Sequence, residues 1–272
     1  MPEVRHARRL GVVALLAGGA LATASPASAA PPAVDPQSVY QVNLPVDGAV
    51  ILAGALAGII PYSLSSHIIH RSCPCPASSV NAFDRSAIGN SSDVADWASS
   101  VTEALAIAVP PVANWFVLRN RRVWFEDAVV FAETMSLNGA FVTMSKYAFQ
   151  RPVPRVYSGD VDPRDAANYR SFYSGHTSYT FAALATASVT IDARYGKTWQ
   201  PWLVTLLVGS SVAAERVLAG YHFYSDVLIG AGAGTVVGAG VALLHLRAPR
   251  LRVSAFAPPG GGGAGIAVGG SL

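Results

Sequence analysis

The sequence predicts an all-α fold, a helical bundle of about six core helices. Of its 272 residues, 51% are hydrophobic and only 13% are charged. The apolar residues gather in long runs that short polar connectors separate. This composition favours one large helical domain, with membrane association, over two ordinary soluble domains.

Six apolar segments are the expected helices of a domain over residues 47–250. They cover 48–64, 99–118, 123–149, 178–191, 201–214 and 227–246. Pro110 and Pro111 predict a bend or break in the second segment, because proline removes a helical hydrogen bond. The last segment is rich in glycine, which predicts close contact with a neighbouring helix; its glycines are Gly230, Gly232, Gly234, Gly238 and Gly240.

Both ends of the chain differ in composition from this domain. Residues 1–29 have three arginines, an apolar stretch and an A-x-A site, the pattern of a cleaved signal peptide. Residues 30–46 are a Pro-rich, extended lead-in, and 251–272 are a Gly-rich tail that forms short strands or stays flexible. We therefore expect export and a location in the cell envelope, membrane-associated or extracytoplasmic.

The sequence leaves open whether the helices cross a bilayer. Glu126, Asp127 and Glu133 lie in the long central segment, where exposure to lipid is unfavourable. If the first three segments crossed after signal cleavage, the basic stretch 119–122 would lie outside, against the positive-inside rule. These points favour an exported bundle associated with the envelope over a simple spanning one.

Charge and cysteine spacing argue against a nucleic-acid surface and against a zinc site at the cysteines. The net charge is +3, and the first nine residues account for +2 of it, so no nucleic-acid surface is expected. His67, His70, Cys73 and Cys75 form H-x2-H-x2-C-x-C. This spacing fits no standard zinc motif, so we expect no metal there.

Reactive side chains concentrate in the C-terminal half. His222 and Asp226 are four residues apart, which on a helix places both on one face. The Asp226 carboxylate would then accept a hydrogen bond from one ring nitrogen, which leaves the other free to attack. Arg216, six residues before His222, is expected to reach the same place.

A second group of residues suits an anion. Ser174, Gly175 and His176 precede an apolar run, as at a helix N-terminus, where free backbone N–H groups favour phosphate. His176 is a candidate general acid toward a leaving oxygen. Lys146 and Arg151, upstream, would supply positive charge to phosphate oxygens.

The combination resembles the type 2 phosphatidic acid phosphatase superfamily, which includes bacterial acid phosphatases and vanadium haloperoxidases. The likeness rests on K-x4-R-P, Y-S-G-H-T-S and R-x5-H-x3-D, between Lys146 and Asp226. It implies an all-helical fold with the site at one end and no metal or organic cofactor. It also implies that His222 is the nucleophile that forms a phosphohistidine, that Asp226 orients it and that His176 protonates the leaving alcohol. Lys146, Arg216, Ser174 and the Gly175 backbone would hold the phosphate.

Two positions depart from the family pattern. Val153 stands where the first motif usually has an arginine, and Arg151 and Arg155 flank it as possible replacements. Glu215 stands where a serine usually precedes the third-motif arginine. A carboxylate beside a phosphate pocket repels substrate unless it points away or pairs with arginine.

The leading hypothesis is therefore a metal-independent phosphatase that acts on a phosphomonoester, with a lipid phosphate such as phosphatidate favoured over a small phosphorylated molecule. A vanadate-dependent haloperoxidase is one alternative, and vanadate would then be its cofactor. A degenerate, non-catalytic envelope protein is the other. We expect His176, His222 and Arg216 to converge on one pocket, with Lys146 at its rim.

Overall fold

The computed structural model describes residues 37–70, 73, 75–247 and the backbone of 251–256 and 265–270. The expected signal peptide, and most of the expected lead-in, lie outside these residues. Val34–Leu246 form one compact unit. The antiparallel strands β1 (Leu251–Phe256) and β2 (Gly265–Gly270) belong to the other unit and lie within the Gly-rich tail.

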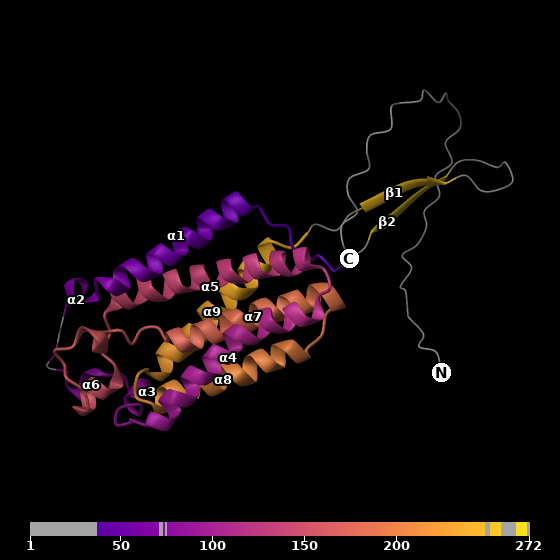
Figure 1. Cartoon of the computed structure of the whole chain (residues 1–272). Helices are drawn as coiled ribbons and strands as arrows, with labels where there is room; N and C mark the ends of the chain where they lie inside the picture. The colour runs from indigo at the N-terminus through magenta and orange to yellow at the C-terminus, as the bar shows by residue number, and fades with distance from the viewer. Residues whose placement is uncertain (1–36, 71–72, 74, 248–250, 257–264, 271–272) are drawn as a thin grey trace. The chain divides into compact units, whose positions relative to one another are not determined.

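Six long helices build the described part of the larger unit (Figure 1), which confirms the all-α bundle. They are α1 (Leu44–Ser63), α4 (Asp93–Val117), α5 (Arg121–Phe149), α7 (Gly175–Tyr195), α8 (Gln200–Leu218) and α9 (Tyr224–Leu244). Short helices lie in the connections: α2 (Ser65–Ile68), α3 (Ala82–Arg85) and α6 (Pro154–Ser158), with 3-10 turns at Ala77–Ser79 and Ala166–Tyr169.

We name the two ends of the bundle after the histidines that flank α9. His222 lies just before this helix and His245 just after it. A helix of 21 residues is about 30 Å long. Contacts between the helices show that α4, α7 and α9 begin at the His222 end, whereas α1, α5 and α8 finish there.

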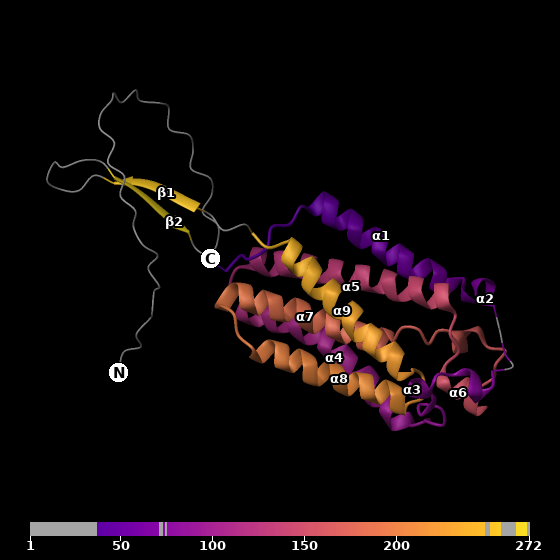
Figure 2. The same ribbon diagram turned by 180° about the vertical axis from the view of Figure 1, so that it is seen from behind.

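Glycine lets α9 pack directly on the backbone of α7. Figure 2 shows α9 crossing in front of α7. A Cβ on Gly230, Gly234 or Gly238 would lie 2.2–2.8 Å from the carbonyl oxygen of the facing residue, which belongs to α7 or, for Gly230, is its N-cap Ser174. This confirms the close helix contact expected from the sequence. Gly232 and Gly240 face open space instead.

Helix α4 differs from the prediction. It begins at Asp93 rather than 99 and continues through Pro110 and Pro111 without a break. The side chain of Ser92 caps it by accepting a hydrogen bond from the Ala95 N–H. The backbone carbonyl of Pro111 accepts a hydrogen bond from the indole N–H of Trp124 at 2.9 Å.

The acidic residues of α5 point inward. Glu126, Asp127 and Glu133 are all buried, and Arg194 holds Asp127 through two hydrogen bonds of 2.8 and 2.9 Å. The cost of exposing them to lipid therefore does not arise. Four other helices, α1, α4, α8 and α9, are long and apolar enough to cross a membrane. Their large apolar side chains face outward, among them Leu56, Phe116, Leu207 and Leu228.

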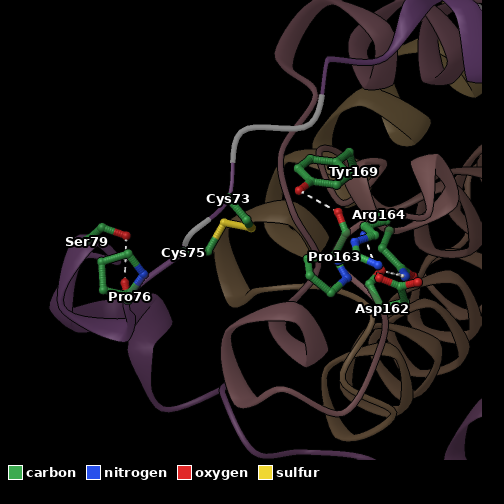
Figure 3. Close-up of a disulfide and its surroundings, with 9 residues drawn as sticks. Cys73, Cys75, Pro76, Ser79, Asp162, Pro163, Arg164 and Tyr169 are labelled. Atoms are coloured by element: carbon green, nitrogen blue, oxygen red, sulfur yellow. Dashed lines mark hydrogen bonds between the residues drawn. A yellow bond between two sulfur atoms is a disulfide. The ribbon is translucent and has the colours of Figure 1, made fainter.

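Cys73 and Cys75 form a disulfide in the connection after α2 (Figure 3). Cys73 packs against a buried cluster of Ile69, Ala166 and Tyr169. The Tyr169 hydroxyl donates to the carbonyl of Pro163 at 2.9 Å. The two sulfurs are thus bonded to each other and are not free thiolates for a zinc ion.

Candidate active site

His222 occupies a short inward turn between α8 and α9. Gly220 makes this turn possible, because its φ of +74° is strained for other residues and a Cβ there would lie 1.9 Å from the carbonyl oxygen of Asn90. His222 is only 4% exposed. The tight crossing of two chain segments therefore delivers the imidazole to the interior.

The orientation of the His222 ring is set by a backbone carbonyl. Its Nδ1 lies 2.7 Å from the carbonyl oxygen of Ser171. A carbonyl only accepts hydrogen bonds, so Nδ1 carries the proton and Nε2 keeps its lone pair. The ring is thus fixed in the tautomer that a nucleophile requires.

Asp226 reaches His222 only indirectly, which corrects the prediction. The helix begins at Tyr224, between the two residues, so they do not share a helical face. The Asp226 carboxylate instead accepts from the Phe223 N–H at 2.9 Å and from the Ser171 hydroxyl at 2.5 Å. It therefore fixes Ser171, whose carbonyl orients His222.

Arg151 also lies elsewhere than expected. Its guanidinium pairs with Asp226 at 2.6 Å and Asp84 at 2.8 Å, and it stacks over the Phe223 ring at 4.0 Å. The hydrogen bonds from Arg151 and Ser225 lower the pKa of Asp84 to about 2, although burial acts in the opposite direction. Arg151 thus stabilises the turn that carries His222 and is not among the described residues that line the central cavity.

The N-terminus of α7 lies where the sequence predicted it. Ser174 is fully buried and caps the helix, with its hydroxyl accepting from the Thr177 N–H at 3.4 Å. Gly175 and His176 follow in the first turn and line the central cavity. The His176 Nε2 lies 3.3 Å from both the Ser100 hydroxyl and a Glu103 carboxylate oxygen.

Three basic side chains line the same cavity: Lys146, Arg170 and Arg216. Lys146 donates to the carbonyl of Arg170 at 2.6 Å. Arg216 is buried, donates to Asp96 and to the Ser99 hydroxyl, and lies 4.7 Å from the centre of the Tyr221 ring. Two of these cations were predicted, whereas Arg170 was not.

The pKa shifts of the basic groups in the cavity come from burial and from their mutual repulsion. Burial and the nearby Arg170 lower the pKa of Lys146 to about 7. Burial, Arg216 and Lys146 lower the pKa of His176 to about 4, and burial with the same cations lowers the pKa of His222 well below its usual value. A bound dianion would oppose the repulsion between these groups and raise the pKa values.

The sequence analysis missed the contribution of α4. Asp96, Ser99, Ser100 and Glu103 fall at spacings of three and four, so they share one face of this helix. This face contacts Arg216 and His176. A polar stripe on an otherwise apolar helix was the available signal, and the expected later start of the helix placed Asp96 outside it.

The cavity has a volume of about 800 Å³ and extends well beyond the histidines. Its wall continues along α5 to the inner face of α1, where Gly54, Gly58 and Ile59 line it. Val153 lines it too, whereas Arg151, Arg155 and Glu215 are not among the described residues of the wall. The space thus combines a cationic end with a long apolar side.

Parts of the chain are similar to known proteins. Residues 127–250 match the model of the PAP2 superfamily. A lipid A 1-phosphatase from Porphyromonas gingivalis is 32% identical over 117 residues, which are 42% of this chain and 23% of the relative. A crystal structure of Aquifex aeolicus LpxE aligns with 65% of this chain and 99% of its own, at 21% identity and a TM-score of 0.42. The matched region, which is just under half of the chain, includes Lys146, His176, Arg216 and His222, so this part of the chain is similar to the PAP2 superfamily.

Proposed function

We propose that this protein hydrolyses a phosphomonoester through a phosphohistidine at His222. The observation that carries the proposal is the fixed tautomer of this ring, with the Nε2 lone pair free in a cavity lined by three basic side chains. A nucleophile beside concentrated positive charge suits attack on a phosphate dianion.

The reaction would proceed in two balanced steps. The His222 Nε2 attacks phosphorus while the ester P–O bond breaks, and the leaving alkoxide takes a proton from His176. A water molecule then attacks the phosphohistidine, His176 accepts its proton, and the P–N bond breaks to release phosphate. Lys146, Arg216 and the first turn of α7 would hold the phosphate oxygens, so the chemistry at this site would need no metal.

Arg170 would take the role of the arginine that the family motif usually has at the position of Val153. It lines the cavity, and the backbone carbonyl of this residue accepts the Lys146 ammonium. Its guanidinium lies 4.8 Å from the centre of the Tyr62 ring at the end of α1. From this position it would contact phosphate oxygens at the rim.

A lipid is the substrate that the cavity suits best. The apolar wall between α1 and α5 continues from the cationic end, so acyl chains would lie along it while the phosphate meets the histidines. Four helices capable of crossing a membrane would keep the protein where such substrates are found, and we place it in the cell envelope. The name of the P. gingivalis relative, a lipid A 1-phosphatase, points to the same substrate class.

The test is phosphate release by the full chain in detergent, from phosphatidate, lipid A and p-nitrophenyl phosphate. We expect vanadate-sensitive release that is greatest on a lipid, is lost in His222→Ala and is retained in His70→Ala, a control at an exposed histidine. Acid-labile phosphate on the trapped protein should require His222. Undiminished release by His222→Ala would refute the mechanism. Vanadate-dependent halide oxidation without phosphate release would instead establish the haloperoxidase alternative, and neither activity would favour a non-catalytic role.

A further inference from the structure

A second cluster of titratable side chains lies at the His245 end of the bundle. The His245 ring meets Asp47 from the first turn of α1 and Glu133 from the middle of α5. Both carboxylates are buried, with 6% and 7% of the residue exposed. One donor atom of each residue lies within 4.8 Å of the other two.

The spacing of these atoms matches ligands around a metal better than hydrogen bonds. The His245 Nε2 lies 3.4 Å from the Glu133 Oε2 and 3.6 Å from the Asp47 Oδ1. A charge-assisted hydrogen bond would be about 2.7–2.9 Å long. By contrast, tetrahedral zinc with bonds of about 2.0–2.2 Å places neighbouring ligand atoms about 3.3–3.6 Å apart. The Glu133 Oε2 is also buried without a hydrogen-bond partner.

The outer atoms of the cluster are already held in place. The His245 Nδ1 lies 2.9 Å from the Val241 carbonyl, so it carries the proton and turns the Nε2 lone pair toward the carboxylates. The other oxygen of Asp47, Oδ2, accepts the Asn43 N–H at 2.7 Å. Such bonds to backbone groups orient the ligands in many metal sites.

The charges of the cluster call for a cation. Two buried carboxylates face one imidazole, and a protonated imidazole would balance only one of them. A buried charge without compensation is strongly unfavourable. A divalent ion would balance both carboxylates and bind the neutral imidazole.

We propose that Asp47, Glu133 and His245 bind a zinc ion. One nitrogen and two carboxylate oxygens are a ligand set that zinc accepts, whereas calcium and magnesium prefer oxygen alone. The ion would tie the start of α1 and the end of α9 to α5. In the same place the Gln41 N–H bonds to the His245 carbonyl at 2.8 Å, and Tyr40 pairs with Leu246. The proposal is independent of phosphatase activity.

Metal content is the direct test. The full chain, purified in detergent, is loaded with Zn²⁺, dialysed against metal-free buffer and analysed by mass spectrometry. We expect about one zinc per chain, and its loss in Glu133→Gln, Asp47→Asn and His245→Gln. His70→Ala should keep the zinc, because that histidine is exposed and outside the cluster. A wild type without zinc, or variants that keep it, would overturn the proposal.

Two further measurements do not rely on the folding of the variants. Zn²⁺ should raise the melting temperature of the wild type, and a chelator should reverse the shift. Co²⁺ in place of zinc should give visible absorption bands of a four-coordinate ion with nitrogen and oxygen ligands. A melting temperature that does not respond to Zn²⁺, together with the spectrum of hydrated Co²⁺, would show that the cluster is a hydrogen-bonded triad only.

Discussion

The two ends of α9 place histidine in opposite electrostatic surroundings. At the His222 end, two imidazoles share one cavity with three cations, Lys146, Arg170 and Arg216, and with one carboxylate, Glu103. At the His245 end, one imidazole faces two buried carboxylates. In both places a backbone carbonyl next to Nδ1 leaves the Nε2 lone pair free. The charged side chains around each imidazole, and not the imidazole itself, thus determine whether we expect an anion or a cation to bind there.

The largest difference between the two ends is expected when a cation is removed from the cavity. Lys146→Met should lower kcat/KM for phosphate release by about 10²–10³-fold, because it deletes a charge that stabilises the transition state. Zinc content should not change, because the His245 end is untouched. Activity within a few-fold of wild type would show that Lys146 does not meet the phosphate.

The second largest effect is expected at Arg170. Arg170→Ala should lower kcat/KM by about 10-fold to 10²-fold, the loss of one charge-assisted contact to phosphate. Arg164→Ala, at an exposed arginine of the same connection, is the matched control and should leave the rate unchanged. Equal effects of the two substitutions would mean that net charge, rather than the position of Arg170, matters.

The pH dependence of binding should have opposite signs at the two ends. With its pKa lowered to about 7, Lys146 is charged below that pH and neutral above it in the free protein. Affinity for tungstate, an oxyanion whose charge is constant over this range, should therefore fall by up to about tenfold per pH unit above 7. Zinc affinity should instead rise with pH, because metal binding displaces protons from its ligands. Competition assays and metal titrations over neutral to mildly alkaline pH would measure both, and Lys146→Met should flatten only the first profile.

The smallest effect concerns the link between Asp226 and His222. Ser171→Ala keeps the carbonyl that holds His222 but removes the hydroxyl that Asp226 accepts. We expect kcat to fall by about 5-fold, which corresponds to about 1 kcal/mol for one hydrogen bond. If Asp226 acts through Ser171, the effects of Ser171→Ala and Asp226→Asn should not be additive in a double-mutant cycle. Additive effects would indicate a separate role for Asp226.

The sequence predicted the helices well where apolar periodicity was unbroken, and the glycine face of α9 was expected before its contacts were known. The expected break at Pro110 and Pro111 was wrong, because α4 continues through both prolines. A separate error, the expected start at 99 rather than 93, left Asp96 outside the helix, and with it one partner of Arg216.

The site shows the same limit. The sequence predicted that His176, Arg216 and His222 would meet in one pocket with Lys146, and all four line the cavity, while their chemical roles stay predictions. The spacing of His222 and Asp226, however, was interpreted as if both lay in a helix, and the helix begins between them. The roles of Ser171, Arg151 and Arg170 depend on how distant segments cross, and no spacing along the chain encodes this.

Helix α1 contributes to the cavity without contributing to the chemistry. Its Gly54 and Gly58 lie against α5, and its inner face forms the apolar side of the space, whereas the reactive groups come from α4 onward. Only two residues of α1, Asp47 and Gly54, are buried. Substitutions on the face of α1 that lines the cavity would therefore change the size of its apolar side while the reactive end stays constant.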